Sequence, residues 1–184
     1  MKFVVDLDKR LDWDSYFMIQ AHVTAARSSC IKRHVGCVVV NDVNRVVSCG
    51  YNGQVPGFVH CDVDTCARKD SPSGENLDLC RAVHAEQNAI TYAAGTSTNL
   101  SGCKWYCTTM PCIHCFKLIL SLDPKLIMFK EGYNPNMFQS IYEDLSRSKR
   151  HDNLKIVQVD LVKEVEHFEV TPIRSWTSEV LNRV

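Results

Sequence analysis

The sequence predicts an α/β fold built on a mixed β-sheet. Two β-branched runs, residues 35–40 and 45–51, are joined by a turn rich in Asn and Asp, which is typical of a β-hairpin. From about residue 81 onward, helical and strand patterns alternate, as they do where crossover helices link strands. The composition is that of a globular protein, with 45% hydrophobic and 23% charged residues among 184. We therefore expect one sheet that combines an antiparallel hairpin with crossover-linked strands.

A helix is predicted before the hairpin, over residues 13–29, because apolar side chains recur there near helical spacing. Either Asp12 or Asp14 is in position to cap it. A second helix is predicted over the Ala-rich residues 81–94, with Gly95 as its C-cap. The remaining elements are expected as strands at 103–109, 125–129 and 154–159, and as helices at 112–122 and 136–148.

Residues 52–79, between the hairpin and the Ala-rich helix, contain Gly and Pro and show little periodicity. An irregular stretch of this length is unusual inside a compact domain, so something other than a core should organise it. Cys61, Cys66 and Cys80 are the candidates. We expect one domain over residues 1–150, followed by residues 151–184, which supply the final strand and a C-terminal extension of unassigned role.

The charge balance and the chain's apolar segments narrow the classes of partner. Lys and Arg total 21, as do Asp and Glu, which disfavours sequence-independent binding to a nucleic-acid backbone. No apolar run approaches the ~18 residues of a membrane span, and the first residues lack a signal peptide pattern. We expect a soluble cytoplasmic protein (in the host cytoplasm if the source is a virus) without nucleic-acid or membrane partners. In such a reducing compartment, the ten cysteines indicate metal binding or catalysis rather than disulfides.

The strongest chemical signal is a His-x-Glu motif, His84 and Glu86, followed by a Pro-Cys-x-x-Cys motif with Cys112 and Cys115. Zinc prefers tetrahedral nitrogen and sulfur ligands, and three protein ligands leave the fourth position for water, as in catalytic sites. The start of a helix favours thiolates at both cysteines. Glu86 need not bind the metal and is placed to transfer protons.

A structural zinc knuckle is the alternative interpretation of the two cysteines. Such a site needs no Glu, so the combined pattern favours the catalytic interpretation. The same signature, with His/Cys/Cys ligands and a Glu that is not a ligand, belongs to zinc-dependent nucleobase deaminases.

Over residues 12–134 the sequence resembles the cytidine deaminase-like superfamily and, within it, the deoxycytidylate (dCMP) deaminases. Besides the two zinc motifs, the resemblance is carried by Ala26-Arg27-Ser28, Cys30, Val35-Gly36, Gly50-Tyr51-Asn52-Gly53, His60-Cys61-Asp62, Val83-His84-Ala85-Glu86-Gln87-Asn88-Ala89-Ile90 and Gly132-Tyr133. It implies a three-layer α/β/α fold with a mixed five-stranded sheet, and an active site where two helix N-termini meet. It also implies hydrolytic deamination of dCMP to dUMP by a zinc-activated hydroxide, which supplies dUMP for thymidylate synthesis.

The resemblance implies that Glu86 protonates N3 of cytosine and later the leaving amine. It also implies that the Ala85 backbone and the Asn52 side chain orient the base and the sugar. Tyr133 is placed to close over the substrate, although a buried packing role fits it equally well.

A doubly charged 5′-phosphate requires Arg or Lys at short range. Arg27, Lys32 and Arg33 flank the junction of the first helix and the first strand and resemble a basic cluster of the family. We assign phosphate or nucleotide contacts to Arg27 and Ser28; a solvated cationic turn is the alternative.

The resemblance also suggests a second, structural zinc site, because some phage and bacterial relatives bind a second zinc ion in this region. Cys30, Cys61, Cys66 and Cys80 are its candidate ligands, and His60 is able to replace one of them. The alternative is a set of unbound thiols that pack as small apolar groups.

The resemblance further implies a homo-oligomer, a hexamer being favoured, with activation by dCTP and Mg²⁺ and inhibition by dTTP. Three other functions remain open at the level of sequence: deamination of dCTP or another cytosine nucleotide, deamination of RNA or single-stranded DNA, and a zinc-binding module without turnover.

Overall fold

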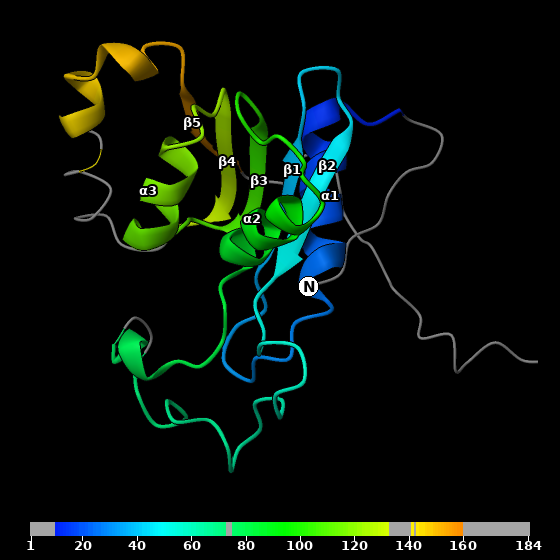
Figure 1. The fold of residues 1–184 in the computed structure, drawn as a ribbon, viewed down its shortest axis with the longest axis vertical. Coiled ribbons are helices and arrows are strands. Elements are labelled where there is room, and N and C mark those ends of the chain that lie inside the picture. The colour runs from blue at the N-terminus through cyan, green and yellow to red at the C-terminus, as the bar shows by residue number, and fades with distance from the viewer. Residues whose placement is uncertain (1–9, 73–74, 133–140, 142, 160–184) are drawn as a thin grey trace, which may run out of the picture. The chain divides into compact units, whose positions relative to one another are not determined.

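The structure, a computed structural model, describes residues 10–72, 75–132, 141 and 143–159 (Figure 1). Apart from Arg10 and Leu11, these residues belong to one unit, Asp12–Val159. Its elements are α1 (Trp13–Ala25), β1 (Gly36–Val40), β2 (Val46–Tyr51), the 3-10 helix η1 (Leu77–Leu79), α2 (Ala85–Gly95), β3 (Lys104–Thr109), α3 (Ile113–Leu120), β4 (Leu126–Glu131), the 3-10 helix η2 (Lys149–His151) and β5 (Lys155–Gln158).

The five strands form one mixed sheet in the order β2-β1-β3-β4-β5. The neighbours of β1 both run antiparallel to it, whereas β3, β4 and β5 run parallel to one another. The predicted hairpin and the predicted mixed sheet are thereby confirmed. In the hairpin turn, the Asn41 side chain accepts hydrogen bonds from the backbone N–H groups of Val43 and Arg45. Asn44 adopts a φ of 56°, which Asn tolerates better than most residues.

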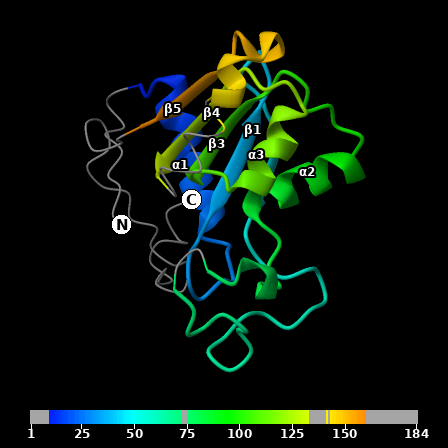
Figure 2. The same ribbon diagram turned by 90° about the vertical axis from the view of Figure 1, so that its left-hand side faces the viewer.

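Helices cover both faces of the sheet, with α1 on one face and α2 and α3 on the other (Figure 2). On the α1 side, the rings of Phe17 and Tyr106 lie 5.2 Å apart. On the other side, Trp105 of β3 and Phe116 of α3 are fully buried in the same apolar cluster as Ala89 of α2. The central strands carry apolar side chains on both faces of the sheet, so each face is covered by helices.

Two glycines let α1 and α2 lie directly against the hairpin. A Cβ atom at Gly36 would lie 2.0 Å from the carbonyl oxygen of Ala21 in α1. A Cβ atom at Gly50 would lie 2.2 Å from the carbonyl oxygen of Ala85, at the start of α2. The absence of a side chain at Gly50 therefore sets how closely the first turn of α2 approaches the sheet.

The boundaries of several helices differ from the sequence-based expectation. The predicted start of the second helix at residue 81 is wrong, because Val83 pairs with Gly53 through two backbone hydrogen bonds of 3.1 and 2.8 Å and stays extended. The helix begins at Ala85, includes Gly95, and has Thr96 as its C-cap. Of the two candidate caps of α1, Asp12 accepts the hydrogen bonds of the first turn, and the helix ends at Ala25 rather than residue 29.

The irregular segment between β2 and α2 contains η1 and a sequence of turns, and it extends beyond the sheet (Figure 1). Residues 141 and 143–146 are helical, and most of the remaining predicted 136–148 helix lies outside the described residues, as do Tyr133 and 160–184. The domain boundary at residue 150 stays a prediction. None of the helices in the described part of the chain has the length and apolar character that crossing a bilayer requires.

The contact at Gly50 predicts a large effect of a small substitution. Gly50→Ala should lower the free energy of unfolding by about 1–3 kcal/mol, because its Cβ meets backbone that belongs to a helix and cannot rotate away. Chemical denaturation measures the change. Gly95→Ala is the matched control, since nothing lies within 4 Å of its Cβ position and Ala favours a helix. Equal stabilities of Gly50→Ala and the unaltered protein would contradict the close approach.

Candidate active site

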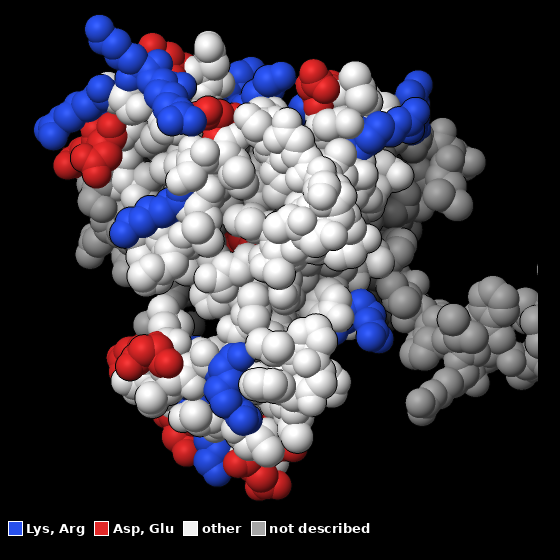
Figure 3. Space-filling model, in the orientation of Figure 1, with Lys and Arg blue, Asp and Glu red and all other residues white. Residues whose placement is uncertain are grey.

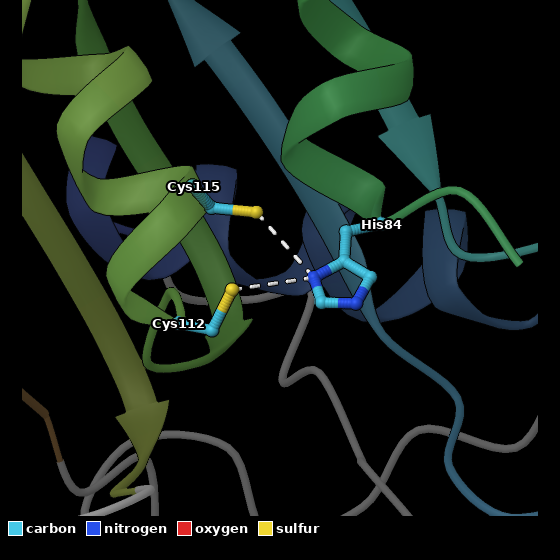
Figure 4. A group of neighbouring side chains, drawn as sticks. All are labelled: His84, Cys112 and Cys115. Carbon is cyan, nitrogen blue, oxygen red and sulfur yellow. Dashed lines mark hydrogen bonds between the residues drawn. The ribbon is translucent and has the colours of Figure 1, made fainter. Parts of the chain in front are cut away.

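The N-termini of α2 and α3 meet beside the sheet and bring three metal-binding side chains together (Figure 4). His84 is the N-cap residue of α2, Cys112 is the N-cap residue of α3, and Cys115 lies in the first turn of α3. The backbone N–H of His84 donates to the side-chain oxygen of Gln87 at 3.0 Å, which holds the residue extended at the helix start. Each ligand is thus placed by the geometry of a helix terminus.

The distances among these side chains fit a tetrahedral zinc ion. The Sγ atoms of Cys112 and Cys115 each lie 3.4 Å from Nδ1 of His84. Nitrogen and sulfur ligands at ordinary zinc distances and tetrahedral angles are separated by roughly 3.5 Å. All three ligand atoms lie within 4.8 Å of one another, and among the described residues no other group of His, Cys, Asp or Glu does so. Three ligands from the chain leave a fourth position for a small molecule.

The electrostatics of the two sulfurs also suit a divalent cation. Hydrogen bonds from the Cys115 thiol and from the His84 ring lower the pKa of Cys112 to about 3, despite its partial burial. The pKa of Cys115 is raised, because its thiol donates to Cys112 and because burial disfavours the thiolate. The neighbouring groups thus favour the thiolate at Cys112, and the charge of a bound zinc ion would favour the thiolate at both cysteines.

Glu86 lies in the first turn of α2, two residues after His84. Its side chain is buried, with 4% of the residue exposed, and burial raises the pKa of its carboxyl group above the ordinary value. A carboxyl group whose pKa moves toward neutral pH exchanges protons more readily with a bound molecule. The structure thus places an acid–base group next to the metal ligands.

A cavity of about 300 Å³ opens over this cluster. Its volume suits a small organic molecule. The lining side chains combine the metal site, apolar walls and three cations, and they are Cys30, Lys32, Arg33, Val35, Asn52, Arg68, Leu77, Cys80, Ala82, His84, Ala85, Glu86, Thr109, Met110 and Cys112.

Asn52, at the end of β2, is held rigidly in the cavity wall. Its side-chain oxygen accepts from the Val35 N–H at 2.8 Å and from the Ser28 hydroxyl at 2.7 Å. Its side-chain nitrogen donates one hydrogen to the carbonyl of Arg33 at 2.8 Å. An amide nitrogen carries two hydrogens, so the second is left to donate to a molecule in the cavity.

The other residues singled out from the sequence divide into those at the cavity and those away from it. Ala85 lines the cavity, whereas Ser28 contacts Asn52 instead, and Arg27 is exposed and outside the lining. Tyr133 lies outside the described residues. Sequence reasoning missed Arg68, because it lies in the irregular segment, where no spacing or motif marks it. The roles in substrate binding assigned to these residues stay predictions.

The four remaining candidate ligands lie near one another without forming a tight cluster. Burial raises the pKa of Cys61, and the charges of Cys66, Cys30 and Cys80 raise it further. The Sγ atom of Cys61 accepts a hydrogen bond from the Gln54 side chain at 2.7 Å. Within the described part of the chain, their ligand atoms do not all come within 4.8 Å of one another. The thiols are therefore neighbours, with sulfur positions wider than a zinc site needs.

The comparisons with known proteins agree with this geometry. The family described as the cytidine and deoxycytidylate deaminase zinc-binding region matches residues 11–131. Deoxycytidylate deaminase of Schizosaccharomyces pombe is 42% identical over 127 residues, which make up 68% of this chain and 39% of that protein. ComE operon protein 2 of Bacillus subtilis is 34% identical over 155 residues, or 83% of this chain and 78% of that protein. This chain thus spans about two fifths of the length of the fission-yeast relative.

Among solved structures, dCMP deaminase from the cyanophage S-TIM5, in complex with dCMP and dUMP, has the same fold with a TM-score of 0.64. It is 23% identical, and the match covers 82% of this chain and 99% of that one. The predicted fold class is confirmed, and zinc is the ion that the family and the His/Cys/Cys ligand set both indicate. By its match over residues 11–131 and by the helix-borne ligands that this region supplies, the chain belongs to the cytidine and deoxycytidylate deaminase zinc-binding family.

Proposed function

We propose that the protein hydrolytically deaminates dCMP to dUMP at the zinc site. The observation that carries the proposal is the convergence of His84, Cys112 and Cys115 beside the buried Glu86, on a cavity that three cationic side chains also line. Relatives named deoxycytidylate deaminase, which are 34–42% identical to this chain, support dCMP as the substrate. A cationic cavity suits a nucleotide better than an uncharged nucleoside.

The chain's own residues account for the proton transfers. When bound, zinc lowers the pKa of a coordinated water toward ~7 and so supplies a nucleophile for C4 of cytosine. Glu86 accepts one proton of that water and delivers it to N3 while the hydroxyl group adds to C4. It then takes the remaining proton of that hydroxyl group and delivers it to the amine, which leaves as ammonia. The carbonyl oxygen of dUMP comes from the water, so atoms and protons balance.

Substrate orientation is assigned to groups that already face the cavity. The second side-chain hydrogen of Asn52 is available to an acceptor on the nucleoside. Ala85 is the first residue of α2, and its N–H has no partner within the helix, so it is available to donate as well. We infer that Ser28 acts on the substrate through Asn52, because its hydroxyl contacts that side chain.

Replacement of Glu86 should separate proton transfer from metal binding. Glu86→Gln is expected to lower kcat on dCMP by about 10²–10⁴-fold while zinc per chain stays unchanged, because a general acid–base group is lost and no ligand is. Cys112→Ser should lose both zinc and activity. Absorbance assays of dCMP turnover and elemental analysis measure the two quantities. Asp42→Asn, an exposed change in the hairpin turn, is the control. Normal deamination by Glu86→Gln would refute the assignment.

A second zinc ion, held by Cys30, Cys61, Cys66 and Cys80, is also proposed. Its support is the proximity of the four thiols within a segment that has few regular elements to order it. The sulfurs need to move closer together than they lie here, and His60 is an alternative ligand.

Zinc stoichiometry tests this second site. The purified protein should contain about two zinc ions per chain, and Cys61→Ser should retain about one, because the His84 site does not depend on Cys61. Cys49→Ser, an exposed thiol of β2 outside the four, should retain both. A count of one in the unaltered protein would remove the structural site and leave the catalytic site untouched.

Regulation and assembly are proposed from the sequence resemblance: a hexamer, activated by dCTP with Mg²⁺ and inhibited by dTTP, that supplies dUMP for thymidylate synthesis in the cytoplasm. Light scattering should give a mass near six times the 20.9 kDa of one chain.

Initial rates with dCMP should rise with dCTP and Mg²⁺ and fall with dTTP. Rates unaffected by either nucleotide would exclude the regulation, and turnover of dCTP itself would make it a substrate rather than an effector.

A further inference from the structure

Positive charge is concentrated at the cavity although the chain as a whole is neutral. Lys32, Arg33 and Arg68 line the cavity, whereas Glu86 is the one acidic side chain among its described lining residues. The formal net charge of the protein is zero, and basic and acidic side chains are intermingled on the face shown in Figure 3. The three cations are therefore a local feature of the cavity. Deamination of an uncharged base does not require them.

Lys32 cannot itself bind a ligand while its present hydrogen bonds last. Its ammonium group donates to the carbonyl oxygen of Arg68 at 2.7 Å, to that of Lys69 at 3.3 Å and to that of Ser71. An ammonium group has three hydrogens, and all three are used. Lys32 thus ties the turn at residues 68–71 to the backbone that enters β1.

The turn that Lys32 holds is also supported from the other side of the irregular segment. Arg81, which precedes α2, donates to the carbonyl oxygen of Thr65 at 2.8 Å. Within the turn, the N–H of Ser71 donates to the carbonyl of Arg68 at 3.1 Å. Cationic side chains at both ends of the irregular segment thus satisfy backbone carbonyl groups within it.

Arg68 is the residue that this arrangement presents to the cavity. It is half-buried, and its Nε–H donates to the carbonyl of Glu75 at 2.9 Å. A guanidinium group has five hydrogens, and the bonds recorded within the described residues leave the four on its Nη atoms to bind a ligand. Their planar geometry matches two oxygens of a phosphate group, which a lysine in the same place does not.

We propose that Arg68, positioned by Lys32, binds the 5′-phosphate of the substrate and makes the site select nucleoside monophosphates over nucleosides. This inference rests on the proposed function, because it assigns the phosphate end of the same substrate. Arg33 also lines the cavity, and its backbone carbonyl accepts from the Asn52 side chain. Arg68 and Asn52 therefore reach the cavity from separate segments of the chain.

Steady-state kinetics on dCMP and deoxycytidine tests the assignment. Arg68→Ala should lower kcat/KM for dCMP by roughly 10- to 100-fold, mainly through KM, and leave deoxycytidine unchanged, because only the charged hydrogen bonds to phosphate are lost. Arg68→Lys should retain part of the preference. Lys69→Ala removes a charge from the same turn without altering the cavity lining and should behave as the unaltered protein.

The positioning role of Lys32 has its own signature. Lys32→Met should also lower kcat/KM for dCMP and leave kcat/KM for deoxycytidine unchanged. Combined with Arg68→Ala it should cause little further loss, because Lys32 acts through Arg68. Additive losses, or equal losses on both substrates, would show that Lys32 only stabilises the fold and would overturn its part in the proposal.

Binding of the products separates failure of this inference from failure of the proposed function. Calorimetry compares dUMP with deoxyuridine and needs no turnover. A protein that prefers dUMP, loses the preference in Arg68→Ala and yet does not deaminate dCMP would support the phosphate site and refute the reaction. If Arg68→Ala or Arg68→Lys retains the full preference for dUMP, or if the unaltered protein has none, the phosphate site is wrong.

Discussion

The meeting of two helix N-termini is the constraint on which the rest of this protein depends. His84 and Cys112 both occupy N-cap positions, and the ligand atoms of the two helices come within 4.8 Å of one another. At such positions the unpaired N–H groups of the first turn favour thiolates and other anions. The sheet contributes by holding the helices in place, and the bare backbone at Gly50 allows α2 to approach closely enough. A metal then joins two helices whose ligands are distant in sequence.

Hydrogen bonds hold the polar part of the cavity lining that the two helices do not supply. Asn52 is hydrogen-bonded to Ser28, Val35 and Arg33. Lys32 joins the irregular segment to the residues that precede β1, and Arg81 bridges two parts of that segment. A segment with few regular elements leaves backbone carbonyl groups without partners in a helix or sheet, and cationic side chains satisfy some of them here. The same segment contributes Arg68 to the cavity. The hydrogen bonds that order the segment therefore also position the side chain proposed to select the substrate.

Much of the fold was predictable because it follows from local patterns. The alternation of β-branched runs and the Asn-rich turn predicted the hairpin, and the Ala-rich stretch predicted α2. The start of that helix was missed because the bridge between Val83 and Gly53 is a long-range contact that overrides local helical preference. The motifs singled out His84, Cys112 and Cys115 as zinc ligands, and the structure brings these three side chains together because each lies at the start of a helix.

The sequence by itself determined which atoms are available to hold a metal and to move protons, since those depend on residue type and short spacing. Only the tertiary structure decided which polar residues reach the cavity. It brought Ser28 into contact with Asn52, left Arg27 exposed outside the lining, and brought Arg68 into the cavity from a position that no motif marks. The physical reason is that these positions depend on hydrogen bonds between residues distant in the chain, such as that from Lys32 to the carbonyl of Arg68, which no local pattern encodes.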